Sequence, residues 1–87
     1  MNTNYAFNLI PADSHKSFYG KAVVIVDGND VLLKSYNTIV AKIRNGEFIR
    51  TWGGWSATTA RHVNSFRIKY GFAPISKGEW SKLPVGG

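Results

Sequence analysis

The chain has 87 residues, the size of one small domain, and its 44% apolar content argues against intrinsic disorder. Because it contains no cysteine, disulfides and cysteine-ligated zinc are excluded as stabilising elements. Eleven Lys and Arg against five Asp and Glu give a net charge of +6, which favours an anionic partner. We expect a single domain over 1–87, structured mainly over 5–83, with a tail over 84–87.

The N-terminal part has the pattern of three strands. Large apolar residues alternate with small or polar ones over 5–9, which predicts a short strand that ends before a proline. Residues 21–26 are β-branched and apolar, and an Asp-Gly-Asn-Asp turn leads to a return strand over 31–36. This pairing sets Val24 opposite Leu33. Both faces of the hairpin are apolar, so we expect it to be central in the sheet or partly covered on both sides.

The next hairpin is closed by Asn45-Gly46, a dipeptide that favours a type I′ turn. That turn sets Ala41 opposite Arg50 and Ile39 opposite Trp52. Strand alternation then divides the hairpin into two faces. The predicted core face holds Ile39, Ala41, Ile43, Phe48, Arg50 and Trp52, and the outer face holds Thr38, Val40, Lys42, Arg44, Glu47, Ile49 and Thr51.

A helix follows a Trp-Gly-Gly-Trp corner. Ser56 is its expected N-cap and Gly71 its expected stop, and apolar residues at helical spacing form one stripe, Thr59, Val63, Phe66 and Tyr70. Ser76, with a glutamate three residues later, has the pattern of a capping box for a short second helix. The sequence therefore predicts an α+β fold: a four- to five-stranded antiparallel sheet packed by one C-terminal amphipathic helix, with a short second helix.

Catalytic and metal-binding patterns are absent from the sequence. His15 and His62 are the only histidines, and the carboxylates are scattered, so no metal site is expected. No serine lies in a Gly-x-Ser-x-Gly elbow, and the glycine corner lacks the spacing and lysine of a phosphate loop. We expect a protein that is not an enzyme and has no cofactor. The N-terminus does not resemble a signal peptide and the apolar runs are too short for a membrane span, so we expect a cytoplasmic protein with no membrane partner.

The remaining signal is a set of basic and aromatic residues. A guanidinium among aromatic rings can receive a phosphate or carboxylate, and an exposed tryptophan can stack on bases. For Arg50 the alternative is a side chain that extends from the rim of the sheet with no further role, and for the tryptophans it is simple core packing. Exposed Ile68 indicates an oligomer or partner contact. The candidate binding residues are Lys42, Arg44, Arg50, Arg61, Lys69, Trp55 and Trp80.

Several segments resemble a family of short uncharacterised proteins from phages and mobile elements, mainly of Gram-positive bacteria. The resemblance covers about residues 16–85 and is carried by Ser-Tyr-Asn-Thr-Ile-Val at 35–40, Phe-Ile-Arg-Thr-Trp at 48–52, Trp-Ser-Ala-Thr-Thr-Ala-Arg-His-Val-Asn-Ser-Phe at 55–66, and the flanking segments 16–22 and 77–84. It implies a small accessory protein of a bacterial host's mobile element, for which nucleic-acid handling and inhibition of a host defence enzyme are common roles.

Two functions follow as expectations. The first is a non-enzymatic protein that engages DNA or RNA through a basic and aromatic face. The second is a protein-binding inhibitor of a host defence system, of the anti-CRISPR kind, that meets an acidic protein surface. A homodimer is compatible with either function.

Overall fold

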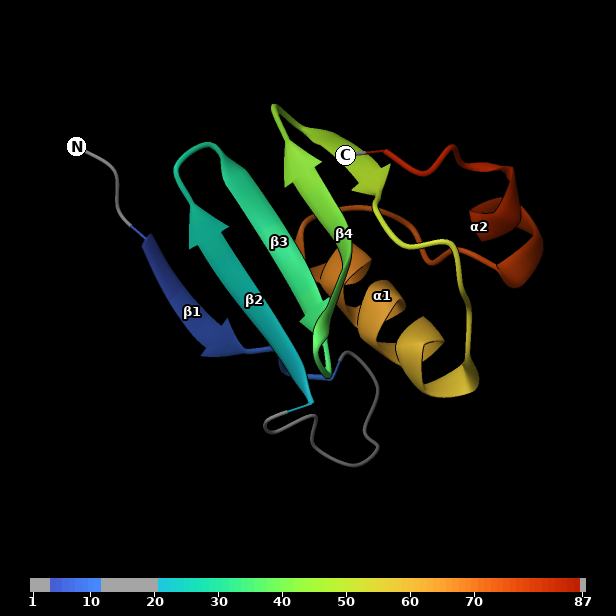
Figure 1. Cartoon of the computed structure of the whole chain (residues 1–87), viewed down its shortest axis with the longest axis horizontal. Helices are drawn as coiled ribbons and strands as arrows, with labels where there is room; N and C mark the ends of the chain where they lie inside the picture. The colour runs from blue at the N-terminus through green and yellow to red at the C-terminus, as the bar shows by residue number, and fades with distance from the viewer. Residues whose placement is uncertain (1–3, 12–20, 87) are drawn as a thin grey trace.

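The computed structural model describes residues 4–11 and 21–86 (Figure 1). Five antiparallel strands lie in chain order in one sheet, and two helices follow, which confirms the predicted α+β class. The strands are β1 (Asn4–Asn8), β2 (Ala22–Asp27), β3 (Asp30–Ser35), β4 (Thr38–Arg44) and β5 (Glu47–Arg50), and the helices are α1 (Ala57–Lys69) and α2 (Lys77–Lys82). His15 and the start of the family pattern at residue 16 lie outside the described residues.

The two predicted hairpins form with the predicted registers around their turns. Val24 pairs with Leu33 in the first hairpin, and Ala41 pairs with Arg50 in the second. Asn45 and Gly46 have φ values of 53° and 82°, the left-handed pair that a type I′ turn requires. The turn chemistry therefore fixes which side chains share a face.

A β-bulge in β4 overturns the face assignment at one end of the second hairpin. The register shifts between Leu33 and Lys34, which pair with Ala41 and Ile39 respectively, so Val40 is the extra residue. Val40 is 1% exposed and belongs to the core, although alternation placed it on the outer face. Ile39 pairs with outward-facing Lys34 and is only half-buried, so its predicted place in the core is wrong.

The ladder of the second hairpin is also shorter than predicted. β5 ends at Arg50, so the expected pairing of Ile39 with Trp52 is wrong. The C-terminal segment lies against this strand instead. Val85 forms a parallel bridge with Arg50, and the Gly86 amide donates to the Arg50 carbonyl at 2.6 Å. Part of the predicted tail thus occupies the outer edge of the sheet.

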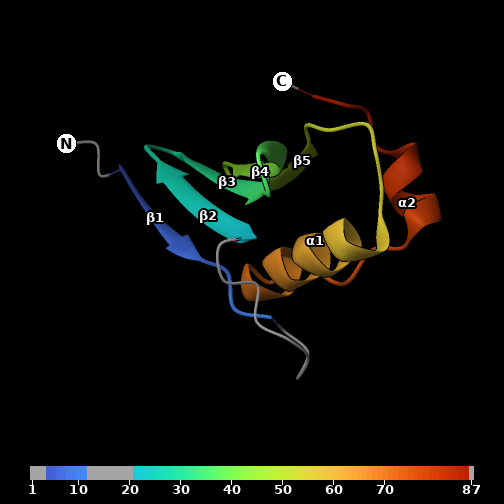
Figure 2. The ribbon, with the colours of Figure 1, turned by 60° about the horizontal axis from the view of Figure 1, so that its bottom comes forward.

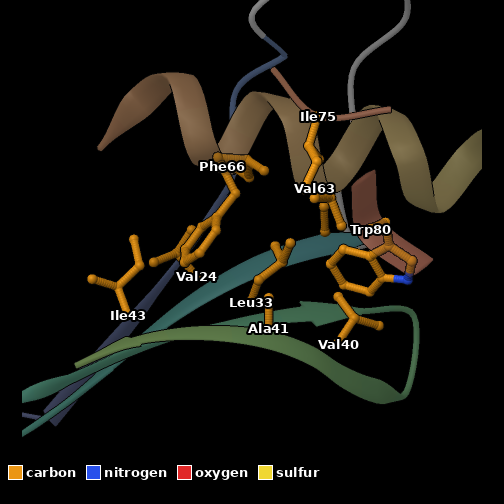
Figure 3. Packing of buried hydrophobic residues seen from close by; sticks show 11 residues of the cluster. Val24, Leu33, Val40, Ala41, Ile43, Val63, Phe66, Ile75 and Trp80 are labelled. Carbon is orange, nitrogen blue, oxygen red and sulfur yellow. The ribbon is translucent and has the colours of Figure 1, made fainter. Parts of the chain in front are cut away.

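The core lies between the sheet and α1 (Figures 2 and 3). Ser56 accepts a hydrogen bond from the Thr59 amide and caps α1, while Gly71, with φ of +86°, ends it, as predicted. Val63 and Phe66 are fully buried against the sheet. The packing of the amphipathic stripe is confirmed.

The second helix closes one end of the core. Ser76 and Glu79 form the predicted capping box, with bonds of 3.1 and 3.2 Å. Trp80 projects from α2 into the core, where it is 1% exposed, and its indole N–H donates to the Gly54 carbonyl at 2.7 Å. This bond ties α2 to the glycine corner that follows β5.

Candidate binding surfaces

The structure separates the predicted basic residues by placing them on both sides of the sheet. Lys42 and Arg44 alternate with the core residues of β4 and face away from the helices, whereas Arg61 and Lys69 belong to α1. The Lys69 ammonium lies 5.4 Å from the centre of the Phe7 ring. The candidates therefore do not form one continuous basic face.

Of the two strand cations, one is paired with a carboxylate and the other is buried. Arg44 donates two hydrogen bonds, of 2.8 and 2.7 Å, to the carboxylate of Asp30, its partner across the strands. This pair holds the pKa of Asp30 below its ordinary value, mainly through the hydrogen bond from Arg44. Lys42 is 5% exposed and pairs across the strands with Leu32 and Ile49. An incoming anion would have to compete with Asp30 for Arg44.

Arg50 is a structural residue of the fold. It is 8% exposed, and its guanidinium donates to four backbone carbonyls: Trp52 at 2.9 Å, Gly53 at 2.7 Å, Trp80 at 2.8 Å and Leu83 at 2.9 Å. Its Cζ lies 5.1 Å from the centre of the Trp80 ring. Neither sequence-based alternative described this role, in which one cation joins the corner after β5 to the end of α2.

The candidate tryptophans are packing residues in this structure. Trp80 is buried, and Trp55 is half-buried with its ring centre 5.5 Å from that of Trp80. Trp80 therefore offers no ring face for stacking on a base. Both tryptophans therefore match the predicted alternative of core packing and not that of stacking on bases.

A buried polar cluster joins β3 to α1. His62, which is 1% exposed, has Nδ1 2.8 Å from the Ser35 hydroxyl, and that hydroxyl lies 3.4 Å from the Thr59 hydroxyl. Burial, together with nearby Arg61 and Lys21, lowers the pKa of His62 to about 4. The imidazole is thus neutral at pH 7, and its burial supports a structural role rather than a nucleophilic one.

An aromatic residue and two cations surround this cluster at the surface. Tyr36 is 50% exposed, and its ring centre lies 5.8 Å from that of His62. Its φ of 54° is uncommon for a bulky residue and costs backbone energy. Lys21 and Arg61 both act electrostatically on the same imidazole, so they lie near this end of the molecule. Of these residues, only Arg61 was predicted from the sequence as a binding candidate.

The open face of the sheet, which we define as the face turned away from α1, is rich in aliphatic side chains. Alternation and pairing assign to it Val23, Ile25, Leu32, Ile39 and Ile49, all half-buried and none a member of the core cluster. Figures 1 and 2 show α1 along the opposite face and α2 beyond the β5 edge. Among residues 4–11 and 21–86, no helix covers the open face.

The open face carries cations within its aliphatic rows. One row runs across all five strands as Ala6, Ile25, Leu32, Lys42 and Ile49. The next row contains Lys34, while the carboxylates of Asp27, Asp30 and Glu47 lie in a separate row at one end of the strands. The apolarity of both faces of the first hairpin was a sequence signal for this surface. Of the two predicted alternatives, the central position is confirmed, because β2 and β3 both lie inside the five-stranded sheet, and cover on both sides is not found among the described residues.

Comparison with known proteins shows the family of the chain. A family of unknown function, DUF8033, matches residues 7–82, and the protein belongs to it. Neither the curated proteins nor the solved structures gave a match. In the described parts of the chain, no helix has the length and apolarity needed to cross a membrane, and no three His, Cys, Asp or Glu residues group as metal ligands.

Proposed function

We propose that this protein is a non-enzymatic binding protein that docks another protein on the open face of its sheet. The observation that carries the proposal is the mainly aliphatic row that crosses the sheet, over which no helix lies in the described parts of the chain. Contiguous apolar surface that is partly open to solvent on a small domain is typical of interaction sites. An inhibitor of a host defence enzyme would be one protein of this kind.

The charges of the open face indicate the chemistry of the partner. Lys42 and Lys34 lie within the aliphatic rows, and the described acidic residues of this face lie outside those rows. Arg44 and Asp30 largely neutralise each other. A partner with an apolar surface that also carries a carboxylate would match the rows, because the carboxylate would meet half-buried Lys34 as water is excluded, whereas Lys42 is buried and adds only its charge. The net charge of +6 opposes self-association and favours such an acidic partner.

Three matched isoleucine variants test the proposal. The protein serves as bait in a nuclease-treated lysate, and any captured protein is purified and titrated against wild type, Ile25→Glu, Ile39→Glu and Ile68→Glu. Ile25 and Ile39 belong to the open face, whereas Ile68 is 46% exposed on α1. We expect a 1:1 complex that the two open-face variants weaken at least about tenfold and that Ile68→Glu preserves, since glutamate removes apolar contact and repels acidic groups.

The result that would overturn the proposal is a complex with equal affinity for all three variants, each shown to be folded by circular dichroism. A concentration-dependent wild-type dimer that Ile25→Glu abolishes would also overturn it, because the occupant of the face would then be a second copy. Light scattering of the free protein distinguishes these outcomes.

Nucleic-acid binding is a second candidate, and it is supported by the cluster of Tyr36, Lys21 and Arg61. A half-exposed aromatic ring beside two cations is suited to stacking on an unpaired base while contacting phosphate. The remaining predicted residues contribute less, because Arg50 and Trp80 are buried. The candidate site is therefore smaller than expected from the sequence and lies at one end of the sheet.

A gel shift with single-stranded DNA and RNA tests this candidate. We expect binding at low salt that weakens steeply as salt rises, since each phosphate contact releases counterions. Arg61→Gln and Lys21→Gln should weaken binding, while Lys77→Gln and Lys82→Gln on α2 serve as charge-matched controls. Absence of retardation at low salt, or equal losses in all four variants, would rule out this site.

A further inference from the structure

A groove between β5, the end of α1 and α2 shares only Glu47 with the surfaces described above. Its volume is about 510 Å³, within the range of roughly 300–1,000 Å³ that is typical of small-molecule sites. Its apolar walls come from two aromatic and two aliphatic residues, and its polar groups are one arginine and two glutamates. The groove is lined by Gly46, Glu47, Phe48, Arg67, Phe72, Ile75, Glu79 and Leu83.

The orientation of Arg67 in this groove is fixed by the protein. Its Nε donates to the Ala73 carbonyl at 2.7 Å, and its Cζ lies 4.5 Å from the centre of the Phe48 ring and 5.2 Å from that of Phe72. A guanidinium held by its Nε and by two rings has little freedom left to lose when it binds a ligand. This preorganisation distinguishes Arg67 from a flexible surface cation.

The outer nitrogens of Arg67 remain available for a ligand. Among the described residues, no acceptor takes a hydrogen bond from Nη1 or Nη2, and no carboxylate lies within 4.0 Å of them. Burial lowers the pKa of Arg67, while nearby Glu79 opposes this change. Glu79 is itself engaged in the capping box, where it accepts from the Ser76 amide. The groove thus contains a half-buried cation that is held in place and has no ion-pair partner in the part of the chain that the structure describes.

The structure assigns this groove to a free small monocarboxylate with an apolar body. The two Nη groups form a planar fork that matches the two oxygens of one carboxylate. Phe72, Ile75 and Leu83 supply the apolar wall for the rest of the ligand. Glu47 and Glu79 line the same groove and repel negative charge, so a single carboxylate held by the Arg67 fork is opposed less than a phosphate dianion.

The assignment is tested by calorimetry and amide chemical shifts with three probes. These are 4-phenylbutyrate, the matched cation 4-phenylbutylammonium, and inorganic phosphate. We expect submillimolar binding of 4-phenylbutyrate, with shift changes confined to residues of the groove, and at least about tenfold weaker binding of the other two probes. Equal binding of the cation would show that the groove takes any apolar body and would overturn the assignment.

Substitutions of Arg67 and of Glu79 should change the affinity for 4-phenylbutyrate in opposite directions. Arg67→Gln should weaken 4-phenylbutyrate at least about tenfold, and Arg67→Lys should also weaken it, since an ammonium cannot form the fork. Glu79→Gln keeps a side chain able to form the capping box but removes a negative charge, so it should strengthen binding about two- to fivefold.

The wild-type probe series and Glu79→Gln decide the question even where an Arg67 variant does not fold. No 4-phenylbutyrate binding up to 10 mM, on the order of the weakest specific binding worth assigning, would overturn the assignment, as would weaker binding to Glu79→Gln. None of these results bears on the open face, because its aliphatic residues do not line the groove.

Discussion

Replacement of Arg50 should be among the most damaging single substitutions in this protein. Its four N–H···O bonds of 2.7–2.9 Å join the corner after β5 to the carbonyls of Trp80 and Leu83. Methionine has a similar reach and is apolar, so Arg50→Met removes these four donors, and among the described residues the Trp80 carbonyl alone keeps a second donor in the Leu83 amide. Each bond to a charged donor contributes about 1.5–3 kcal/mol, but the burial of the guanidinium offsets part of the sum.

The net loss should therefore be about 3–5 kcal/mol, the scale of breaking a buried charged network. A domain of this length has a total stability of roughly 4–13 kcal/mol, so Arg50→Met should remove between about a quarter and all of it. The expected fall in melting temperature is about 15 °C or more. Arg50→Lys should lose about 2 kcal/mol, because one ammonium cannot reach carbonyls on both sides.

Urea and thermal unfolding followed by circular dichroism measure these losses, and hydrogen exchange locates them. Exchange should accelerate first in α2, whose C-terminal carbonyls bind Arg50. Arg44→Gln is the control, since Arg44 is an exposed arginine of the same hairpin whose pair with Asp30 is open to water. If Arg50→Lys and Arg44→Gln lowered the melting temperature equally, the reasoning would be refuted.

Further predictions concern stability at four other places. Protonation of His62 should cost the fold about 3 kcal/mol: its pKa falls from about 6.5 in the unfolded chain to about 4, so stability is complete above pH 6.5 and is lost as the pH falls to 4. Urea titrations of the wild type from pH 7 to 4 check this. A free energy of unfolding that does not change over this pH range would contradict it. Val40→Thr should cost about 1–3 kcal/mol by burying a hydroxyl, while Ile39→Thr should cost under about 1 kcal/mol; the reverse order in thermal melts would disprove the bulge. Gly78→Ala should stabilise α2 by about 0.5–1 kcal/mol, because a Cβ meets only the far end of one side chain at 3.9 Å. Gly54→Ala should destabilise the protein, because its Cβ would overlap the adjacent indole ring, and a melting temperature equal to that of wild type would argue against this close approach.

Local chemistry determines the parts of the fold that the sequence predicted. The Asn45-Gly46 turn needs two positive φ values, and this requirement alone sets the register near the turn. Ser56 and the capping box of α2 act within one helical turn, so short sequence patterns were sufficient to place both helix starts. Features that depend on neighbours within about four residues were therefore predictable.

The bulge at Val40 depends on contacts that are distant in the sequence. The residues around it are Ile39 and Ala41, and no glycine or proline marks the extra residue. Its position is set by how β3 pairs with β4 and by the space beneath α1, where Val40 fills the core beside Trp80 (Figure 3). Strict alternation predicted the faces of β4 correctly from Arg44 back to Ala41. It failed at Val40, the next residue away from the turn.

The roles of the arginines were the least predictable feature, because the same side chain serves opposite purposes depending on its surroundings. Arg44 is held by a carboxylate and Arg50 by backbone carbonyls, so most of their hydrogen-bonding capacity is used within the fold. Arg67 donates to the fold only through its Nε, and no acceptor among the described residues takes its outer nitrogens. Net charge counts these three residues equally, although only the last combines a fixed orientation with available donors. A count of cations therefore predicts that an anionic partner is attracted to the protein, whereas the site of contact depends on which cations the fold itself has left without an acceptor.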